Sequence, residues 1–178
     1  MHSNDNETKI SSAYGPVLVM VFYEALCPDS KYFIIKQLQT AYYKAPALID
    51  FQLIPYGKAT TTTNADGSLA FTCQHGEIEC NANIYHACCV EAIDEPKILI
   101  DVIACMIKNN VLPKEAMQRC AKENQVEWEP IQKCYDRQAR ICKRLLIPKG
   151  SLSPPINYVC VTCRSPPIIT NDYSFPFD

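Results

Sequence analysis

The stretch "PVLVMVFYEALCPDSKYF", residues 16–33, contains the transition on which the fold depends. Its first part is a continuous apolar run rich in β-branched residues, which is typical of a strand buried on both faces. From Asp29 to about Tyr43, apolar residues recur at helical spacing after a proline suited to a first helical turn. Cys27 therefore lies where a strand at 17–23 passes into a helix.

A second strand is predicted at 48–54, inside "ALIDFQLIPYG", where Pro55 and Gly57 close the run. A strand, a helix and a strand in this order form a βαβ unit, whose two strands are parallel and whose connection is right-handed. The polar stretch that follows, "KATTTTNADGS" at 58–68, is expected to be a surface loop.

The middle of the chain is predicted to be helical, from about 78 to 146. Pro96 and Pro113 stand where the first turn of a helix tolerates proline. A strand pattern returns at 157–162. We therefore predict an α/β fold in which the three strands share one sheet and the helical block packs beside it.

The chain has 178 residues, enough for one domain with a core but tight for two. We expect a polar N-terminal tail at 1–15 and a single domain at 16–178. Seventeen basic and nineteen acidic residues nearly balance, which argues against nucleic acid as a partner. No segment approaches the ~20 apolar residues of a membrane span.

Eleven cysteines, spread from Cys27 to Cys163, indicate an oxidising compartment. A glycosylation sequon at Asn6 agrees with the secretory route. We expect a secreted protein whose signal peptide is absent from this chain, because the polar start has no apolar core. Delivery to the lysosome is the alternative.

Residues 73–88, "CQHGEIECNANIYHAC", fit the pattern C-Q-H-G-x2-E-C-x2-N-x4-C at every fixed position. The pattern resembles the signature of the gamma-interferon-inducible lysosomal thiol reductase (GILT) family, and invertebrate members, including divergent mosquito ones, look most similar. The resemblance spans most of the chain, as far as "WEPIQKC" at 128–134. The fixed positions are Cys73, Gln74, His75, Gly76, Glu79, Cys80, Asn83 and Cys88.

The resemblance implies a thioredoxin-like fold with a disulfide-stapled helical insertion. It also implies disulfide reduction by two cysteines at positions matching 27 and 30, but the second position holds Ser30. A further departure is "NYVCVTC", which places Cys160 where the family usually has a proline that is cis and faces the active cysteines. No cofactor is expected, and the partners would be proteins, including disulfide-containing ones.

The chemistry of reduction explains why Ser30 matters. A thiolate attacks a substrate disulfide, and a cysteine at a helix N-terminus, such as Cys27, suits this step because the helix dipole stabilises the anion. A second thiol must then resolve the mixed disulfide. Because a serine hydroxyl forms no stable cross-link to sulfur, the reaction should stall unless an external thiol releases the adduct.

Two states of Cys27 are open. Because eleven is an odd number, at least one cysteine is unpaired or pairs with another molecule, and we favour Cys27 as the free thiol. The alternative is a structural half-cystine, with Cys160 as a candidate partner. We expect structural roles for the cysteines outside the active position and the signature, namely Cys89, Cys105, Cys120, Cys134, Cys142, Cys160 and Cys163.

His75 and His86 stand near Cys73 and Cys80 in the sequence, which raises the question of a zinc site. No metal is expected, because cysteines in secreted chains usually oxidise. We expect His75 and Glu79 to shape the turn that presents the disulfides.

Two functions from different classes follow. We favour a secreted GILT-like protein that lacks efficient reductase activity and binds other proteins. The alternative is a one-cysteine oxidoreductase or isomerase that uses an external thiol.

Overall fold

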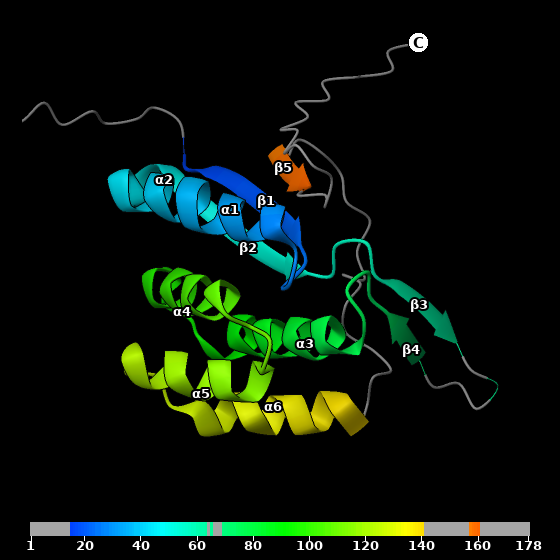
Figure 1. The fold of residues 1–178 in the computed structure, drawn as a ribbon. Coiled ribbons are helices and arrows are strands. Elements are labelled where there is room, and N and C mark those ends of the chain that lie inside the picture. Colours follow the sequence, from blue (N-terminus) through cyan, green and yellow to red (C-terminus); the bar gives the residue numbers. More distant parts are fainter. Residues whose placement is uncertain (1–14, 64, 66–68, 141–156, 161–178) are drawn as a thin grey trace, which may run out of the picture.

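The computed structural model describes residues 15–63, 65, 69–140 and 157–160 (Figure 1). Its first half contains β1 Val17–Tyr23, α1 Pro28–Tyr32, a π-helical segment Phe33–Leu38, α2 Gln39–Lys44, a 3-10 turn Pro46–Leu48, β2 Ile49–Pro55, β3 Thr60–Thr63 and β4 Leu69–Thr72. Its second half contains α3 Glu77–Ala92, α4 Pro96–Lys108, α5 Pro113–Glu123, α6 Trp128–Arg140 and β5 Asn157–Cys160.

The main sheet is parallel and has the strand order β2-β1-β5. Val21, fully buried in the middle of β1, lies in register with Leu53 on one side and Val159 on the other. The prediction that three strands share one sheet is therefore confirmed. The ends of β1 and β2 differ from the predicted ends by at most one residue, and β5 begins at the predicted residue 157. The apolar character of β1 follows from its central position, since both of its faces are covered.

The polar stretch at 58–68 was expected to be a loop, and this prediction is wrong. Four consecutive threonines form β3, which pairs with β4 in antiparallel register, Thr60 opposite Thr72 and Thr63 opposite Leu69. Because threonine is β-branched, it favours extended backbone, and its hydroxyl tolerates the solvent on the outer face. The ribbon projects from the body of the molecule (Figure 1).

The helices form layers on the sheet. In Figure 1, α1 and α2 lie along β1, whereas α3 and α4 lie below the sheet, with α5 and α6 on their far side. One continuous core joins these layers, and its fully buried members come from β1, the first helical segment and the helical block. They include Val21, Ile34, Ile100, Ile103, Met106, Met117 and Ile131.

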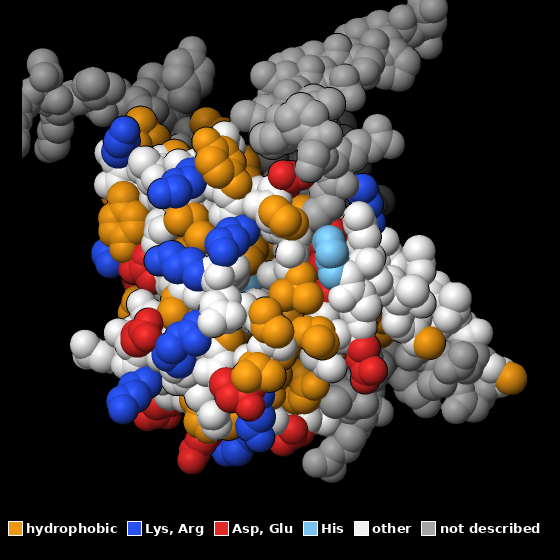
Figure 2. Space-filling model, viewed as in Figure 1, with side chains coloured by type: hydrophobic (Ala, Val, Ile, Leu, Met, Phe, Trp, Pro, Cys, Tyr) orange, Lys and Arg blue, Asp and Glu red, His pale blue; other side chains and the backbone are white. Residues whose placement is uncertain are grey.

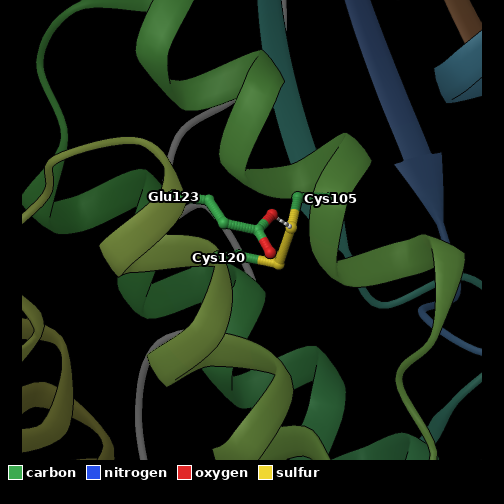
Figure 3. Close-up of side chains that lie close together, drawn as sticks. All are labelled: Cys105, Cys120 and Glu123. Carbon is green, nitrogen blue, oxygen red and sulfur yellow. Dashed lines mark hydrogen bonds between the residues drawn. A yellow bond between two sulfur atoms is a disulfide. The ribbon is translucent and has the colours of Figure 1, made fainter.

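Three disulfides are described, and each one joins cysteines of the segment from 73 to 134. Cys88 and Cys134 link α3 to α6, across 46 residues of sequence. Cys105 and Cys120 link α4 to α5, where Glu123 Oε2 approaches Cys105 Sγ to 3.2 Å (Figure 3). The third, Cys73–Cys80, closes a loop of the signature across 7 residues.

The lengths of these loops predict unequal contributions to stability. Replacing Cys88 and Cys134 together by alanine should lower the free energy of unfolding by about 4 kcal/mol, against about 2.5 kcal/mol for Cys73 and Cys80, since a longer loop restricts the unfolded chain more. Urea unfolding of the oxidised variants measures both values. Cys89→Ala, which leaves all three disulfides intact, is the control for loss of a buried sulfur, and an equal loss in the two double variants would contradict the prediction.

Candidate functional site

Cys27 lies at the N-terminus of α1, as the sequence predicts. It is the N-cap residue, and its Sγ accepts a hydrogen bond from the backbone N–H of Ser30 at 3.4 Å. Pro28 occupies the first turn, where no backbone N–H is needed. The helix dipole therefore acts on the Cys27 sulfur, although this side chain is 0% exposed.

Cys27 is disulfide-bonded in the structure, so the favoured expectation of a free thiol is wrong for this state. Its partner is not among the other cysteines whose side chains the structure describes, because these form three pairs and one free thiol. Cys142 and Cys163 lie outside the described residues. The backbone of Cys160, the candidate partner from the sequence, lies in register with Phe22 on the neighbouring strand.

The free thiol among the described cysteines is Cys89, for which a structural role was expected. Its Sγ is fully buried, 3.1 Å from Met117 Sδ and 3.8 Å from Met106 Sδ. Cys88 precedes it by about 100° of helical rotation and therefore reaches α6, whereas Cys89 faces the core between α4 and α5. Burial raises the pKa of the Cys89 thiol far above its ordinary value, so this sulfur is a packing group.

Ser30, which the resemblance was expected to align with the second cysteine of the reductase site, is also 0% exposed. Its Oγ accepts a hydrogen bond from the backbone N–H of Glu24 at 3.2 Å. The hydroxyl therefore ties the first turn of α1 back to the end of β1. The buried Ser30 hydroxyl is therefore a satisfied polar group.

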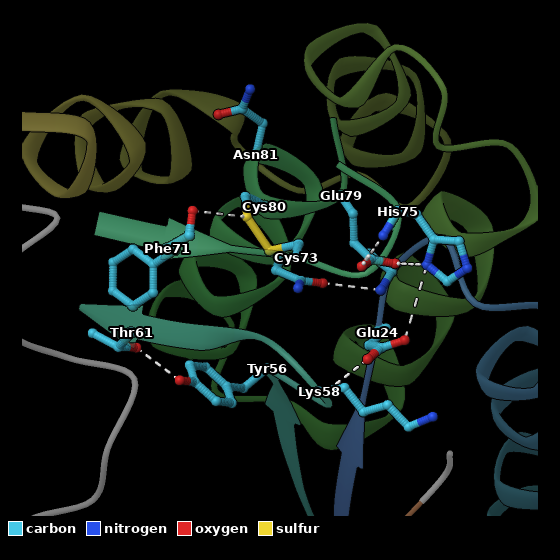
Figure 4. Close-up of a disulfide and its surroundings, with 12 residues drawn as sticks. Glu24, Tyr56, Lys58, Thr61, Phe71, Cys73, His75, Glu79, Cys80 and Asn81 are labelled. Atoms are coloured by element: carbon cyan, nitrogen blue, oxygen red, sulfur yellow. Dashed lines mark hydrogen bonds and ion pairs between the residues drawn. A yellow bond between two sulfur atoms is a disulfide. The ribbon is translucent and has the colours of Figure 1, made fainter. Parts of the chain in front are cut away.

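Residues of the signature surround the turn between β1 and α1. Asn83, buried on α3, accepts the backbone N–H of Ala25 at 2.9 Å through Oδ1. Glu79 is fully buried, and its carboxylate contacts both the backbone N–H of His75, at 3.1 Å, and the ring Nδ1 of His75, at 2.6 Å (Figure 4). These bonds fold the chain between Cys73 and Cys80. Gln74 lies exposed on the same turn.

Glu24 is a site residue that the sequence reasoning missed. Its side chain is 1% exposed, and Oε1 accepts the backbone N–H of Lys58 at 2.6 Å. Gly57 has φ +53°, and a Cβ there would lie 2.2 Å from Glu24 Cγ, so only glycine lets the chain pass. Burial is the largest cause that raises the pKa of Glu24. The available signal was an acidic residue at the end of an otherwise apolar strand.

His86 is not brought together with Cys73 and Cys80, which are joined to each other. It lies in the core, with Nδ1 2.9 Å from Tyr23 Oη and Nε2 3.0 Å from Asn110 Nδ2. Burial lowers the pKa of His86 to about 3 and raises the pKa of Tyr23 well above its ordinary value. The zinc set considered in the sequence is therefore not assembled, and His86 is a neutral structural histidine.

A cavity of about 200 Å³ lies beside the Cys73–Cys80 disulfide, between the β3–β4 ribbon and α3. Its wall is mostly apolar, with Tyr56, Phe71 and Ile84 among the lining residues. Tyr56 is held by a hydrogen bond between its Oη and Thr61 Oγ1, 2.7 Å apart. The sequence could not reveal this cavity, because one wall depends on the unexpected ribbon.

Comparison with known proteins shows which family the chain resembles. Residues 18–124 match the family described as "Gamma interferon inducible lysosomal thiol reductase (GILT)". A gamma-interferon-inducible lysosomal thiol reductase of Carassius auratus is 32% identical over 149 residues, which are 82% of this chain and 58% of that protein. A gamma-interferon-inducible lysosomal thiol reductase-like protein of Anopheles gambiae is 35% identical over 137 residues (69% and 56%), and GILT-like protein 1 of Drosophila melanogaster is 34% identical over 144 residues (70% and 56%).

The chain belongs to the GILT family, as the signature at 73–88 predicts. It spans a little under three fifths of the length of these curated relatives. Within the part of the chain that is described, no helix has the length and apolar character needed to cross a membrane. The sequon at Asn6 lies outside the described residues.

The state of the cysteines can be checked by alkylation. Without reductant, iodoacetamide should leave the native protein almost unlabelled at Cys27 and Cys89, the first because it is oxidised and the second because it is buried with a raised pKa. After unfolding in guanidinium without reductant, iodoacetamide should label Cys89 but not Cys27, and peptide mass mapping would show this. Cys89→Ala is the control, and labelling of Cys27 before reduction would contradict the structure.

His86 should make stability depend on pH. In the unfolded chain His86 is protonated below its ordinary pKa of 6.5, whereas in the folded protein it stays neutral down to about pH 3. The free energy of unfolding therefore decreases as the pH falls through this range. Between pH 6.5 and about pH 4.5, the free energy of unfolding of wild type should decrease by about 2 kcal/mol more than that of His86→Gln, because the variant has no imidazole at this position. Urea unfolding across this range measures the difference, with His2→Gln as a control; parallel curves for wild type and His86→Gln would refute it.

Proposed function

We propose that this chain is a secreted or lysosomal GILT-family protein that lacks efficient disulfide reductase activity and acts by binding other proteins. The observation that carries the proposal is the state of Cys27 and Ser30. Cys27 is buried in a disulfide, and the resolving position holds Ser30, whose buried hydroxyl is engaged with the Glu24 backbone.

This arrangement bears on each step of reduction. An attacking thiolate must be exposed, but the Cys27 sulfur is covered and already oxidised. Even after its release by an external thiol, Cys27 would form a mixed disulfide that Ser30 cannot resolve. The helix N-terminus at Cys27 retains the electrostatic advantage of a reactive cysteine, which keeps the one-cysteine oxidoreductase as the alternative.

A binding role is supported by the exposed apolar surface. On the face seen in Figure 2, apolar side chains gather over α3 and the connection between α4 and α5. Val111 and Leu112 in this connection are 61% and 62% exposed, and Ile78 on the first turn of α3 is 46% exposed. Apolar groups exposed in this number, with the cavity beside the Cys73–Cys80 disulfide nearby on α3, are typical of protein-binding surfaces.

The proposal includes a thioredoxin-like fold, built as a single domain at 16–178. Its support is the βαβ unit β1–α1–α2–β2, with Cys27 at the start of the helix that follows the first strand. The three described disulfides of the segment from 73 to 134 support passage through an oxidising compartment.

Insulin reduction with dithiothreitol or glutathione, at acidic and neutral pH, tests the proposal. Wild type should barely exceed the uncatalysed rate, since no resolving thiol follows Cys27, and Ser30→Ala should match it. Ser30→Cys restores the spacing of the family and should raise the rate, but only in part, because Cys27 is oxidised and buried. Wild-type turnover that Cys27→Ala abolishes would instead establish the one-cysteine enzyme.

Binding is measured on the same samples, by fluorescence anisotropy of labelled insulin chains whose cysteines have been alkylated. Wild type and Ser30→Ala should bind equally, whereas Leu112→Ser should weaken binding, because it removes an exposed apolar contact. Absence of binding by wild type would refute the proposed role.

A further inference from the structure

Three ligand-bearing side chains from two segments of the chain converge beside the strand–helix turn. Glu24 directly follows β1, whereas His75 lies in the loop before α3 and Glu79 on the first turn of α3. One ligand atom from each lies within 4.8 Å of the other two. Figure 4 shows the two carboxylates and the imidazole turned toward one another.

The hydrogen bonds of this group leave one carboxylate oxygen, Glu24 Oε2, without a partner among the described residues. His75 Nδ1 lies 2.6 Å from Glu79 Oε2, and the Glu24 Oε1 atom accepts the Lys58 backbone N–H. Glu24 Oε2 is buried and has no hydrogen-bond partner among the described residues, although it lies 3.9 Å from His75 Nδ1. A buried carboxylate oxygen without a partner is costly, and this one points toward the other two ligand atoms.

From this geometry we propose that Glu24, His75 and Glu79 form a binding site for a divalent metal ion of the Zn²⁺ or Mn²⁺ type. Two carboxylate oxygens and one imidazole nitrogen are a ligand set suited to these ions. The cation would take the place of the hydrogen bond between His75 Nδ1 and Glu79 Oε2, and would give Glu24 Oε2 a partner. Ligand bonds of about 2.0–2.2 Å require only small shifts of the three atoms.

The charges around Glu24, His75 and Glu79 favour a cation between these residues. Glu24 and Glu79 are both buried, so their charges repel each other with little screening by water. A divalent ion would neutralise the two carboxylates.

The site is closed by protein on the carboxylate side and open at the histidine. The His75 side chain is 33% exposed, against 1% and 0% for Glu24 and Glu79. Three protein ligands with access for water at a further position are typical of an exchangeable metal site. No cysteine is needed, since Cys73 and Cys80 are joined to each other.

Calorimetric titration of the full oxidised chain with ZnCl₂ and MnCl₂ at neutral pH tests the proposal. We expect one site that binds Zn²⁺ more tightly than Mn²⁺, in keeping with the usual order for such ligands. Glu24→Gln and His75→Asn should each weaken Zn²⁺ binding by about tenfold or more, because each removes one ligand. Two matched controls, Glu77→Gln on the same turn of α3 and His2→Asn, should change it by less than about twofold.

A second measurement locates the ion. Mn²⁺ should selectively broaden the amide NMR signals of the 24–27 and 73–80 segments in wild type. His75→Asn, which alters a partly exposed side chain, decides the matter if Glu24→Gln does not fold. The proposal is overturned if wild type shows no one-site binding, if His75→Asn binds as wild type does, or if broadening centres elsewhere; His75 and Glu79 would then be a hydrogen-bonded pair beside Glu24.

Discussion

The turn between β1 and α1 is held by hydrogen bonds from α1 and from two distant parts of the chain, and the relative placement of the sheet and the helices depends on it. The Glu24 amide binds Ser30 of α1, the Ala25 amide binds Asn83 of α3, and the Glu24 carboxylate binds the Lys58 amide. The first two contacts are buried and the third is partly buried, so each lost partner would leave a polar group in the interior unsatisfied. The turn thereby fixes the sheet, the first helix and the helical block relative to one another.

The same turn shows how position 30 supports the fold without a thiol. The Ser30 hydroxyl accepts a hydrogen bond that closes the turn, so Ser30 stabilises the backbone around Cys27. Cys27 lies at the helix N-terminus as an oxidised, covered sulfur. Thiol–disulfide exchange between positions 27 and 30 would need a second thiol, and a serine hydroxyl does not supply one.

The helical block owes its arrangement to both packing and covalent links. Met106, Met117 and Ile131 come from α4, α5 and α6 and are fully buried in one core. The Cys105–Cys120 disulfide joins α4 to α5, and the Cys88–Cys134 disulfide joins α6 to α3. The disulfides act mainly on the unfolded chain, whereas the side chains determine how the helices fit together. Cys89 illustrates the difference, since it lies next to a half-cystine yet serves as an apolar packing group.

The sequence by itself determined the family, through the fixed residues of 73–88, and the main sheet, because buried parallel strands and helices that begin at proline leave strong local patterns. It also determined that position 30 carries no thiol. It failed on the threonine ribbon, where composition suggested a loop, and on Cys27 and Cys89, because an odd number of cysteines says nothing about which sulfurs meet in space. Only the tertiary structure brought Glu24 to His75 and Glu79, since their contact depends on Gly57 allowing the chain to pass and on α3 docking beside β1. Long-range contacts of this kind follow from the packing of whole elements, and no local pattern encodes them.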